Sequence, residues 1–192
     1  MTIKGKNVAE LKSAAKANLR EHYGFGKDSK NLALVAVADP AAREFLAKGL
    51  SALGLGTVLW ETPEAPAKKP RKGAKKADAV EVPVTVDPEN VARAGKIDKN
   101  RLYAFDFVVW DDQHAGLDLV EAMSCGVTPV VPAKNTFSGM LTQFDPMRFE
   151  GNSFHFNDVD PFLMFAASVA YLENAKFPED KRILLKNVLQ TF

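Results

Sequence analysis

A strand, a loop, a helix and a second strand between residues 104 and 132 constrain the fold of this chain more than any other stretch. Residues 105–110 form an apolar run rich in β-branched and aromatic side chains, which is typical of a buried strand. Residues 117–125 predict a short helix that ends at Gly126, and residues 127–131 predict a second buried strand. Strands joined by a helix run parallel to each other, and the connection between them is right-handed.

This unit also predicts where a ligand would bind. In open parallel sheets, ligands occupy the crevice beyond the carboxyl ends of the strands. Residues 111–116 and 132–139 follow the two strands, so they are predicted to form the mouth of a binding site. Glu121 lies on the intervening helix and is predicted to flank that mouth.

The remainder of the chain alternates strands and helices in the same way. Asp caps a helix and Pro suits its first turn, so three Asp-Pro pairs predict helix starts: Asp39-Pro40, Asp87-Pro88 and Asp160-Pro161. Apolar runs predict further strands at residues 32–38, 57–61 and 80–86, and the last of these contains a proline, which favours an edge position. The sequence therefore predicts one α/β domain over residues 1–192, with a Rossmann-like, doubly wound and mostly parallel sheet.

Apolar spacing predicts which faces of the helices are buried. The first helix, at residues 7–21, carries one stripe that would face the core and one that would face solvent. The core stripe consists of Val8, Leu11, Ala15 and Leu19, and the solvent stripe of Lys12, Lys16 and Arg20. Four later phenylalanines are predicted to lie in the core, and any exposed part of that set would mark a protein contact face: Phe154, Phe156, Phe162 and Phe165.

Residues 62–78 form a basic insertion without a large apolar side chain. Such a segment buries too little apolar surface to offset the entropy of ordering, so we expect a flexible loop between strands. Six basic side chains fall between residues 65 and 78, against one acidic side chain. The insertion lacks the interleaved aromatic residues that stack on bases, so a solvated loop is favoured and nucleic acid is not an expected partner.

The composition excludes several classes of protein. No run approaches the roughly 20 apolar residues of a membrane span, and the N-terminus lacks the apolar core of a signal peptide. The single cysteine, Cys125, fits a reducing, cytoplasmic location and is predicted to be a small packed residue. Cysteine and histidine are too few for a structural zinc site, so no metal site is expected. The net charge of +1 favours no class of partner.

The stretch around the central helix resembles the donor-site signature of retaining glycosyltransferases of the GT-B type, which contain two Rossmann domains. The similarity continues through residues 151–154, covers residues 100–192 well and covers the earlier part loosely. Within the family, glycogen and starch synthases look most similar. The residues that carry the resemblance are Gly116-Leu117, Glu121-Ala122-Met123, Gly126 and Pro129-Val130-Val131. The resemblance implies the fold of the donor-binding half of such an enzyme.

The resemblance also implies a site for a UDP- or ADP-sugar. In the family, two carboxylates separated by seven residues face the nucleotide sugar; here the second is Glu121, and the first position holds Gln113. Glu121 has a simpler interpretation as a residue that favours a helix N-terminus. His114 is either a general acid or base or a solvated polar residue, and the second interpretation is favoured. No catalytic residue is assigned, and the candidate binding residues are Gln113, His114, Gly116, Leu117, Glu121, Thr136, Ser138 and Gly139.

Other features of the family's site are absent. The Arg and Lys that clamp the donor phosphates have no counterpart after the first strand, at residues 37–43, and of the later glycines only Gly139 is retained. Residues 106–160 carry nine acidic side chains against Lys134 and Arg148, a balance that would repel a nucleotide diphosphate unless a metal or local cations offset it. A chain of 192 residues also leaves no room for the second Rossmann domain that would hold the acceptor.

These departures give three hypotheses. The first is a stand-alone, degenerate donor-domain homologue, a pseudoenzyme without transfer activity alone that acts by protein contacts or weak nucleotide binding. The alternative is the donor-binding subunit of a split glycosyltransferase, with a second Rossmann domain or a homo-oligomer as partner. A lesser alternative is a receiver-like phosphoacceptor domain, because Asp39, Asp111 and Asp112 follow predicted strands as the Mg²⁺-binding carboxylates of receivers do.

Overall fold

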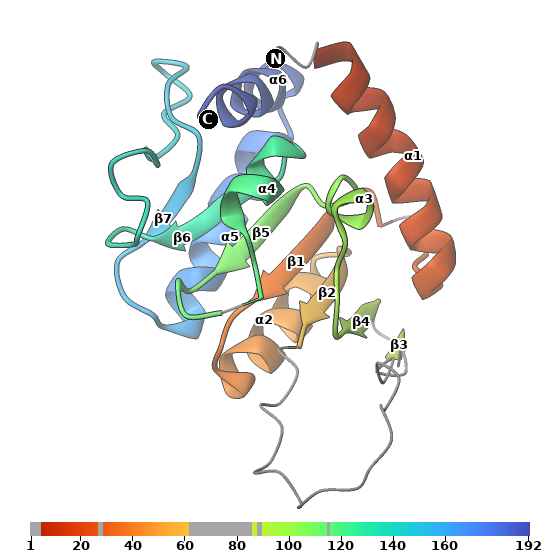
Figure 1. The fold of residues 1–192 in the computed structure, drawn as a ribbon. Helices are drawn as coiled ribbons and strands as arrows, with labels where there is room; N and C mark the ends of the chain where they lie inside the picture. The colour runs from red at the N-terminus through yellow and green to blue at the C-terminus, as the bar shows by residue number, and fades with distance from the viewer. Residues whose placement is uncertain (1–4, 27–28, 62–85, 88–89, 115) are drawn as a thin grey trace, which may run out of the picture.

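The computed structural model describes residues 5–26, 29–61, 86–87, 90–114 and 116–192 (Figure 1). Within these residues the strands are β1 (Leu32–Ala36), β2 (Gly56–Trp60), β3 (Val86–Asp87), β4 (Val91–Ala94), β5 (Phe107–Trp110), β6 (Thr128–Pro132) and β7 (Phe154–Phe156). The helices are α1 (Gly5–Tyr23), α2 (Pro40–Ala52), α3 (Lys99–Leu102), α4 (Leu119–Ser124), α5 (Pro161–Ala175) and α6 (Pro178–Leu189).

The strands form one sheet in the order β3-β4-β2-β1-β5-β6-β7, and every neighbouring pair is parallel except β3 with β4. From β1 the chain moves outward through β2 to β4, then returns to β5 on the other side of β1 and continues to β7. The predicted α/β fold with a Rossmann-like, mostly parallel sheet is therefore confirmed. In such sheets the ligand crevice lies where the winding reverses, which here is between β1 and β5.

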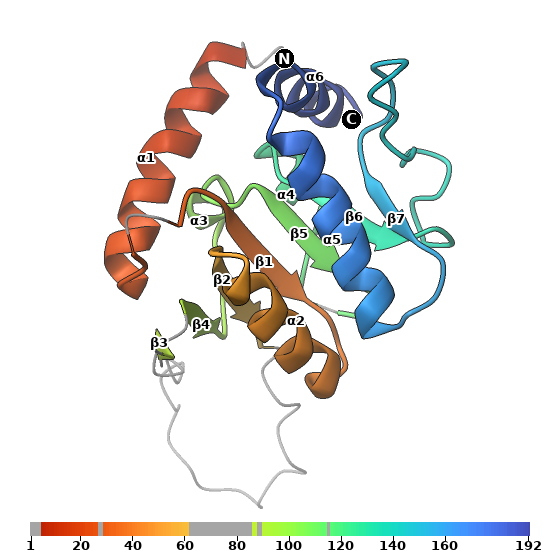
Figure 2. The ribbon, with the colours of Figure 1, turned by 180° about the vertical axis from the view of Figure 1, so that it is seen from behind.

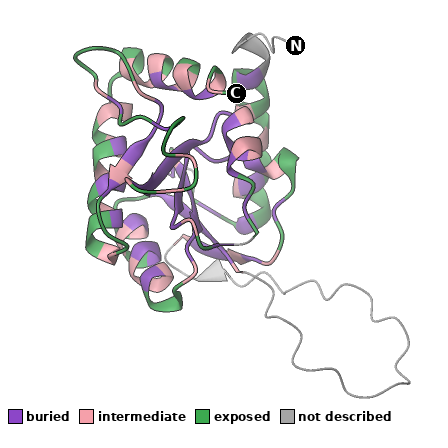
Figure 3. Cartoon of the chain, turned by 60° about the vertical axis from the view of Figure 1, so that its left-hand side comes forward, coloured by how far each residue is buried: buried purple, intermediate pink, exposed green. Residues whose placement is uncertain are grey.

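Helices cover both faces of the sheet. Helices α2 and α5 pack side by side over one face, which Figure 2 shows from its outer side. Helices α3 and α4 lie on the other face with α1 beside them, and α6 contacts both α4 and α5 (Figure 1). Figure 3 shows the result: the central strands are buried, and each helix buries only its inward face.

Capping residues fix where the helices begin. Asp39, Asp118 and Asp160 each accept backbone amide hydrogen bonds at the start of α2, α4 and α5. The predicted helix starts at Asp39-Pro40 and Asp160-Pro161 are therefore confirmed. Gly126 follows α4 with φ of 74°, a conformation that favours glycine, and it ends the helix as predicted.

The prediction of a helix from Asp87 to residue 95 is wrong. Residues 91–94 form β4, which pairs in parallel with β2. Their side chains at positions 91, 92 and 94 are buried in the sheet, so pairing with β2 outweighs the local helix-start signal of an Asp-Pro pair. Of the predicted strand at 80–86, only Val86 lies within the described residues, where it begins the edge strand β3. The insertion at 62–78 lies outside the described residues.

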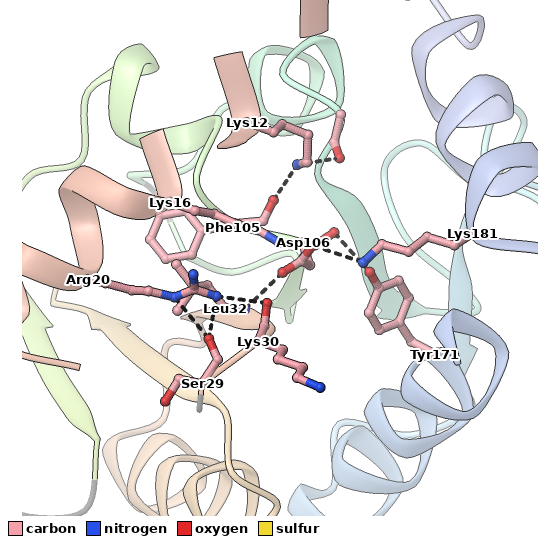
Figure 4. A network of polar contacts seen from close by, with 11 residues as sticks. Lys12, Lys16, Arg20, Ser29, Lys30, Leu32, Phe105, Asp106, Tyr171 and Lys181 are labelled. Carbon is pink, nitrogen blue, oxygen red and sulfur yellow. Dashed lines mark hydrogen bonds and ion pairs between the residues drawn. The ribbon is translucent and has the colours of Figure 1, made fainter. Parts of the chain in front are cut away.

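The basic face of α1 contacts the segments that precede β1, β5 and β6, so the predicted solvent position of Lys12, Lys16 and Arg20 is wrong (Figure 4). Lys12 Nζ donates hydrogen bonds to the carbonyl oxygens of Phe105 and Gly126, at 2.6 and 2.9 Å. Leu11, predicted to be buried, is 41% exposed. The backbone carbonyls before β5 and β6 need donors, and the long lysine side chains of α1 supply them.

Asp106 is the centre of this basic cluster. Its carboxylate accepts hydrogen bonds from Lys16 Nζ at 2.6 Å and from the amide of Leu32 at 2.9 Å, and Lys181 of α6 lies 3.6 Å away (Figure 4). Burial alone would raise the pKa of Asp106, but the surrounding lysine ammonium groups outweigh it, so that pKa is lowered. Burial lowers the pKa of Lys12 to about 8. The cluster ties both α1 and α6 to the start of β5.

The predicted burial of the later phenylalanines, in β7 and α5, is correct only in part. Phe154 and Phe156 are buried as expected, but Phe162 is 68% exposed. The residues of α5 that face the core are Met164, Ala167, Ser168 and Tyr171. The four consecutive apolar residues at the start of α5 cannot all point toward the core. The Phe162 side chain therefore lies outside it. In the part of the chain that the structure describes, no helix has both the length and the apolar character needed to cross a membrane.

Candidate functional site

At the switch point between β1 and β5, a carboxylate of the chain itself accepts backbone hydrogen bonds. Asp111 follows β5, is only 2% exposed, and accepts a hydrogen bond from the amide of Ala38, which follows β1, at 2.6 Å. The same carboxylate accepts from the amides of Gln113 and His114, at 3.1 and 3.2 Å. Asp111 thus occupies the backbone donors at the point where an anionic ligand of a doubly wound sheet would bind.

A second carboxylate occupies the start of α2, which is next to the same crevice. Asp39 accepts hydrogen bonds from the amides of Ala41 and Ala42, at 3.2 and 3.1 Å. Free amides at a helix N-terminus attract phosphate groups, because they carry the positive end of the helix dipole. In α2 two of these amides are already bonded, and the cap adds a negative charge.

His114 is buried, which corrects the prediction of a solvated loop residue. It is 3% exposed, and its Nε2 lies 3.0 Å from the carbonyl oxygen of Trp60 at the end of β2. Arg43 of α2 approaches the same carbonyl, with Nη1 at 3.4 Å. Burial lowers the pKa of His114 from its usual 6.5, which favours the neutral imidazole. A neutral ring with Nε2 as donor satisfies the Trp60 carbonyl.

Gly116 and Leu117 hold the loop against this histidine. Gly116 is exposed, and a Cβ atom added there would lie 3.2 Å from His114 Cε1 and 3.4 Å from the Trp60 ring. Leu117 is 9% exposed and belongs to the core. Gly116 is therefore explained by close packing of the loop on His114 and Trp60, and Leu117 by burial.

The loop after β6 is fastened to the loop after β5 by a third carboxylate. Asp112 accepts hydrogen bonds from the Thr136 amide at 2.9 Å and from its Oγ1 at 2.7 Å. Asp112 has φ of 64°, in the left-handed region that asparagine and aspartate tolerate best. Ser138 and Gly139 are exposed on the same loop. The structure therefore brings Thr136 next to the loop of residues 111–116, as predicted from the two strands.

Gln113 and Glu121 present their side chains differently. Gln113 is exposed on the loop after β5. Glu121 turns toward α3, where its carboxylate lies 3.8 Å from Lys99 Nζ. The side chains of this pair are 41% and 55% exposed, so the pair contributes little to stability. The Glu121 carboxylate therefore lies close to Lys99 while it stays partly exposed to solvent.

The receiver-like alternative does not fit this geometry. Receivers have the strand order 2-1-3-4-5. Here the parallel strand β4 lies beyond β2, so the six parallel strands, numbered along the chain without β3, have the order 3-2-1-4-5-6. Asp111 is buried and bonded to three amides, which leaves it closed to a phosphoryl donor. Among the described residues, no group of three or more His, Cys, Asp or Glu side chains is placed to hold a metal ion.

Sequence reasoning missed two contributors, Trp60 and Arg43. Trp60 is the last residue of a correctly predicted strand, and its carbonyl is the shared acceptor for His114 and Arg43. An aromatic residue at the carboxyl end of a central strand was a usable signal, because that edge of the sheet carries the ligand site. The orientation of Arg43 had no sequence signal, since it depends on how α2 packs against β2.

The fold matches solved glycosyltransferase structures. No protein-family model and no curated protein sequence matches the chain. The catalytic domain of starch synthase IV from Arabidopsis thaliana, bound to ADP and acarbose, is 15% identical, with a TM-score of 0.62 over 95% of this chain. Sucrose-phosphate synthase from Thermosynechococcus elongatus is 14% identical, with a TM-score of 0.54 over 91% of this chain. The glycotransferase of kitacinnamycin is 17% identical, with a TM-score of 0.53 over 86% of this chain.

This chain spans only part of each matched structure, namely 39%, 43% and 40% of the three chains in the order given. At such low identity the likeness shows the fold alone. The predicted fold, that of one half of a GT-B glycosyltransferase, is thereby confirmed.

Proposed function

We propose that this chain, which has the fold of one domain of a GT-B glycosyltransferase, is a degenerate donor-domain homologue that transfers no sugar by itself. In this proposal it acts through contacts with another protein, in the cytoplasm, and binds nucleotide sugars weakly or not at all. The partner would be a second Rossmann domain, another protein or a further copy of the chain.

One observation carries the proposal: the backbone amides around the crevice are bonded to the chain's own carboxylates. Asp111 takes three of them, Asp39 takes two, and Asp112 takes that of Thr136. A nucleotide diphosphate needs such donors for its phosphates and is repelled by these three negative charges. To bind, it would have to displace hydrogen-bonded carboxylates, of which Asp111 is buried, and that displacement is costly.

The side chains around the crevice support the same conclusion. Gln113 stands where the resemblance places the first of two carboxylates, and it supplies no negative charge to a cationic transition state. Glu121, at the position of the second carboxylate, is paired with Lys99. Arg43 of α2 donates to the Trp60 carbonyl. Arg43 and Glu121 are therefore each already engaged by another group of the chain.

Calorimetry tests this function directly. The purified chain is titrated with ADP, UDP and their glucose conjugates, with and without Mg²⁺, and is assayed for glucosyl transfer. We expect no heat of binding at millimolar ligand and no transfer. Asp111→Asn, which removes the charge and keeps an acceptor, should bind ADP more tightly than the original chain. Specific, saturable transfer by the chain alone contradicts the proposal.

A second candidate is the donor-binding subunit of a split glycosyltransferase. The observation that favours it is that the chain matches 39% of a starch synthase IV catalytic domain that was solved with ADP. Gln113, Ser138 and Gly139 are exposed at the carboxyl edge and would meet the ligand. This candidate predicts micromolar binding that Glu121→Ala abolishes, and sugar transfer in complex with a second Rossmann domain. Unchanged binding in Glu121→Ala would remove it.

A further inference from the structure

Helix α5 lies on the outside of the domain, yet its sequence is that of a buried helix (Figure 2). No charged residue occurs from Pro161 to Leu172, and the first one is Glu173. A helix that is apolar on all sides is normally enclosed by other elements, whereas a surface helix carries charges on its outer side. Helix α2 covers one flank of α5 and the sheet covers its inner side. The outer side of α5 is therefore apolar and exposed.

The outward side chains of α5 form one stripe along the helix. Phe162, Ala166 and Ala170 follow each other at intervals of four residues, and all three are exposed. Leu163, which is 40% exposed, and Val169, which is half-buried, lie beside them. These five residues are called the outer stripe. The core residues of α5 lie on the opposite side of the helix, so the fold itself does not use the outer stripe.

The two ends of the outer stripe differ in side-chain size. Phe162, at the first end, is 68% exposed, and its ring lies against Phe45 of α2 with 4.6 Å between the ring centroids. Ala170, at the other end, leaves a shallow surface, and Ala166 lies midway, four residues from each. A second α5 laid antiparallel over the first, with a two-fold axis at Ala166, would place each Phe162 on Ala170 of the other copy. Large side chains then face small ones, which is the arrangement that fills space.

The charges near the outer stripe argue against a membrane surface as its partner. Helices that bind anionic membranes carry Lys and Arg beside their apolar side. Asp158 and Asp160 precede the stripe, and Lys176, which follows it, is paired with Glu173 at 2.6 Å. Helix α2 adds one exposed basic residue, Lys48, which the two aspartates offset. An uncharged protein surface is favoured instead, because the centre of a protein interface is depleted in charged residues.

We propose that the outer stripe of α5 is the contact between two copies of this chain, related by a two-fold axis at Ala166. A two-fold interface uses the same surface of both copies, so that surface has to be complementary to itself. The outer stripe meets this condition in size and in its lack of charge. A contact about 20 Å long is at the small end of specific interfaces, so we expect a dimer dissociation constant in the micromolar range. This inference rests on the proposed role in protein contacts and names a second copy as the partner.

Sedimentation velocity of the full chain over a range of concentrations tests the proposal. We expect monomers at low micromolar concentration and dimers at several hundred micromolar. Ala166→Glu should raise the dimer dissociation constant at least tenfold, because it would bring two carboxylates together at the axis. Leu11→Glu is the matched control, since Leu11 is a 41% exposed residue of α1, and it should leave the constant unchanged. A chain that stays monomeric throughout, or a dimer that Ala166→Glu does not weaken, overturns the proposal.

A mixture of two variants separates the interface from folding. Ala166→Lys should weaken the dimer as Ala166→Glu does, since like charges again meet at the axis. Both variants should keep the melting temperature of the original chain, because Glu and Lys are good helix formers at an exposed position. An equimolar mixture of the two should form dimers again, because a carboxylate then faces an ammonium group. A mixture that stays monomeric would show that position 166 does not face its own copy and overturns the proposal.

Two further results are distinguishable from these. Flotation of the chain with vesicles of phosphatidylcholine and phosphatidylserine, lost in Ala166→Glu, would identify a membrane as the partner and overturn the proposal. Sedimentation uses no nucleotide, so a monomeric chain would leave the calorimetric test of the proposed function intact. A chain that dimerises through α5 and also binds ADP tightly would contradict the proposed function and support this interface.

Discussion

The Asp111 carboxylate accepts a hydrogen bond of 2.6 Å from the amide of Ala38, and this bond joins the ends of β5 and β1. These two strands flank the point where the winding of the sheet reverses. In a ligand-binding domain of this architecture, backbone amides at that point face the ligand. Here they face an aspartate that belongs to the chain. This bond is therefore an internal contact at the switch point of the sheet.

Replacing Asp111 should therefore destabilise the fold strongly. Asp111→Ala leaves three amides without this acceptor, that of His114 being buried, and should lower the free energy of unfolding by about 3 to 5 kcal/mol. Asp111→Asn retains one acceptor oxygen and should cost about 1 to 2 kcal/mol. Urea denaturation followed by circular dichroism gives both values. Asp118→Ala, which removes the exposed cap of α4, should cost only about 1 kcal/mol. Equal losses for Asp111→Ala and Asp118→Ala would contradict this account.

The docking of α1 should depend on pH through Lys12. Its pKa in the folded chain is about 8, below the unfolded value of 10.5, so the unfolded state binds more protons between these values. The free energy of unfolding therefore rises with pH in this window, by about 1 kcal/mol per pH unit. Lys12→Met removes this dependence. The check is the difference between the two proteins at pH 8 and pH 9, in which other titrating groups cancel. A constant difference would show that Lys12 keeps its ordinary pKa.

Much of the fold could be predicted because the signals are local. The buried run at 105–110 and the caps Asp39 and Asp160 act within a few residues, and each gave an element close to its observed bounds. The segment at 91–94 shows the limit of such signals. Its Asp-Pro start predicts a helix, yet β2 offers an open edge, and only the assembled sheet reveals that.

The site was less predictable because its contacts join residues far apart in the chain. The candidate residues other than Glu121 lie on the loops after β5 and β6, since parallel strands end at one edge, and Glu121 lies on α4 as expected. The partners were not foreseen: Asp111 with Ala38, His114 with Trp60, and Asp112 with Thr136. For the same reason Lys12 was expected to face solvent, because its acceptors are carbonyls more than ninety residues away.

Two glycines with positive φ should respond very differently to alanine. Gly54 has φ of 79° with open space around it. Gly54→Ala should therefore lower the free energy of unfolding only by the cost of the strained backbone conformation, about 1 kcal/mol. At Gly151 an added Cβ atom would also meet backbone atoms of Gln143 and Phe144. Backbone cannot move aside as a flexible side chain does, so Gly151→Ala should cost about 3 kcal/mol or more. Thermal unfolding of both variants measures the contrast, and similar losses would contradict the close approach.

His114 should make the domain sensitive to mild acid. Burial lowers its pKa below 6.5, so the unfolded state takes up a proton before the folded state does. The stabilising effect of the neutral ring is complete above pH 6.5 and is lost as pH falls toward the folded pKa. Protonation would also place a hydrogen on Nδ1, which has no hydrogen-bond partner among the described residues. We expect His114→Gln to be less stable than the original chain at pH 7 and to lose less stability on going to pH 5. His155→Gln is the matched control, because burial also lowers the pKa of His155. This variant should remove only the part of the pH dependence of stability that comes from His155. If the original chain and His114→Gln lose equal stability between pH 7 and pH 5, the buried neutral state of His114 is wrong.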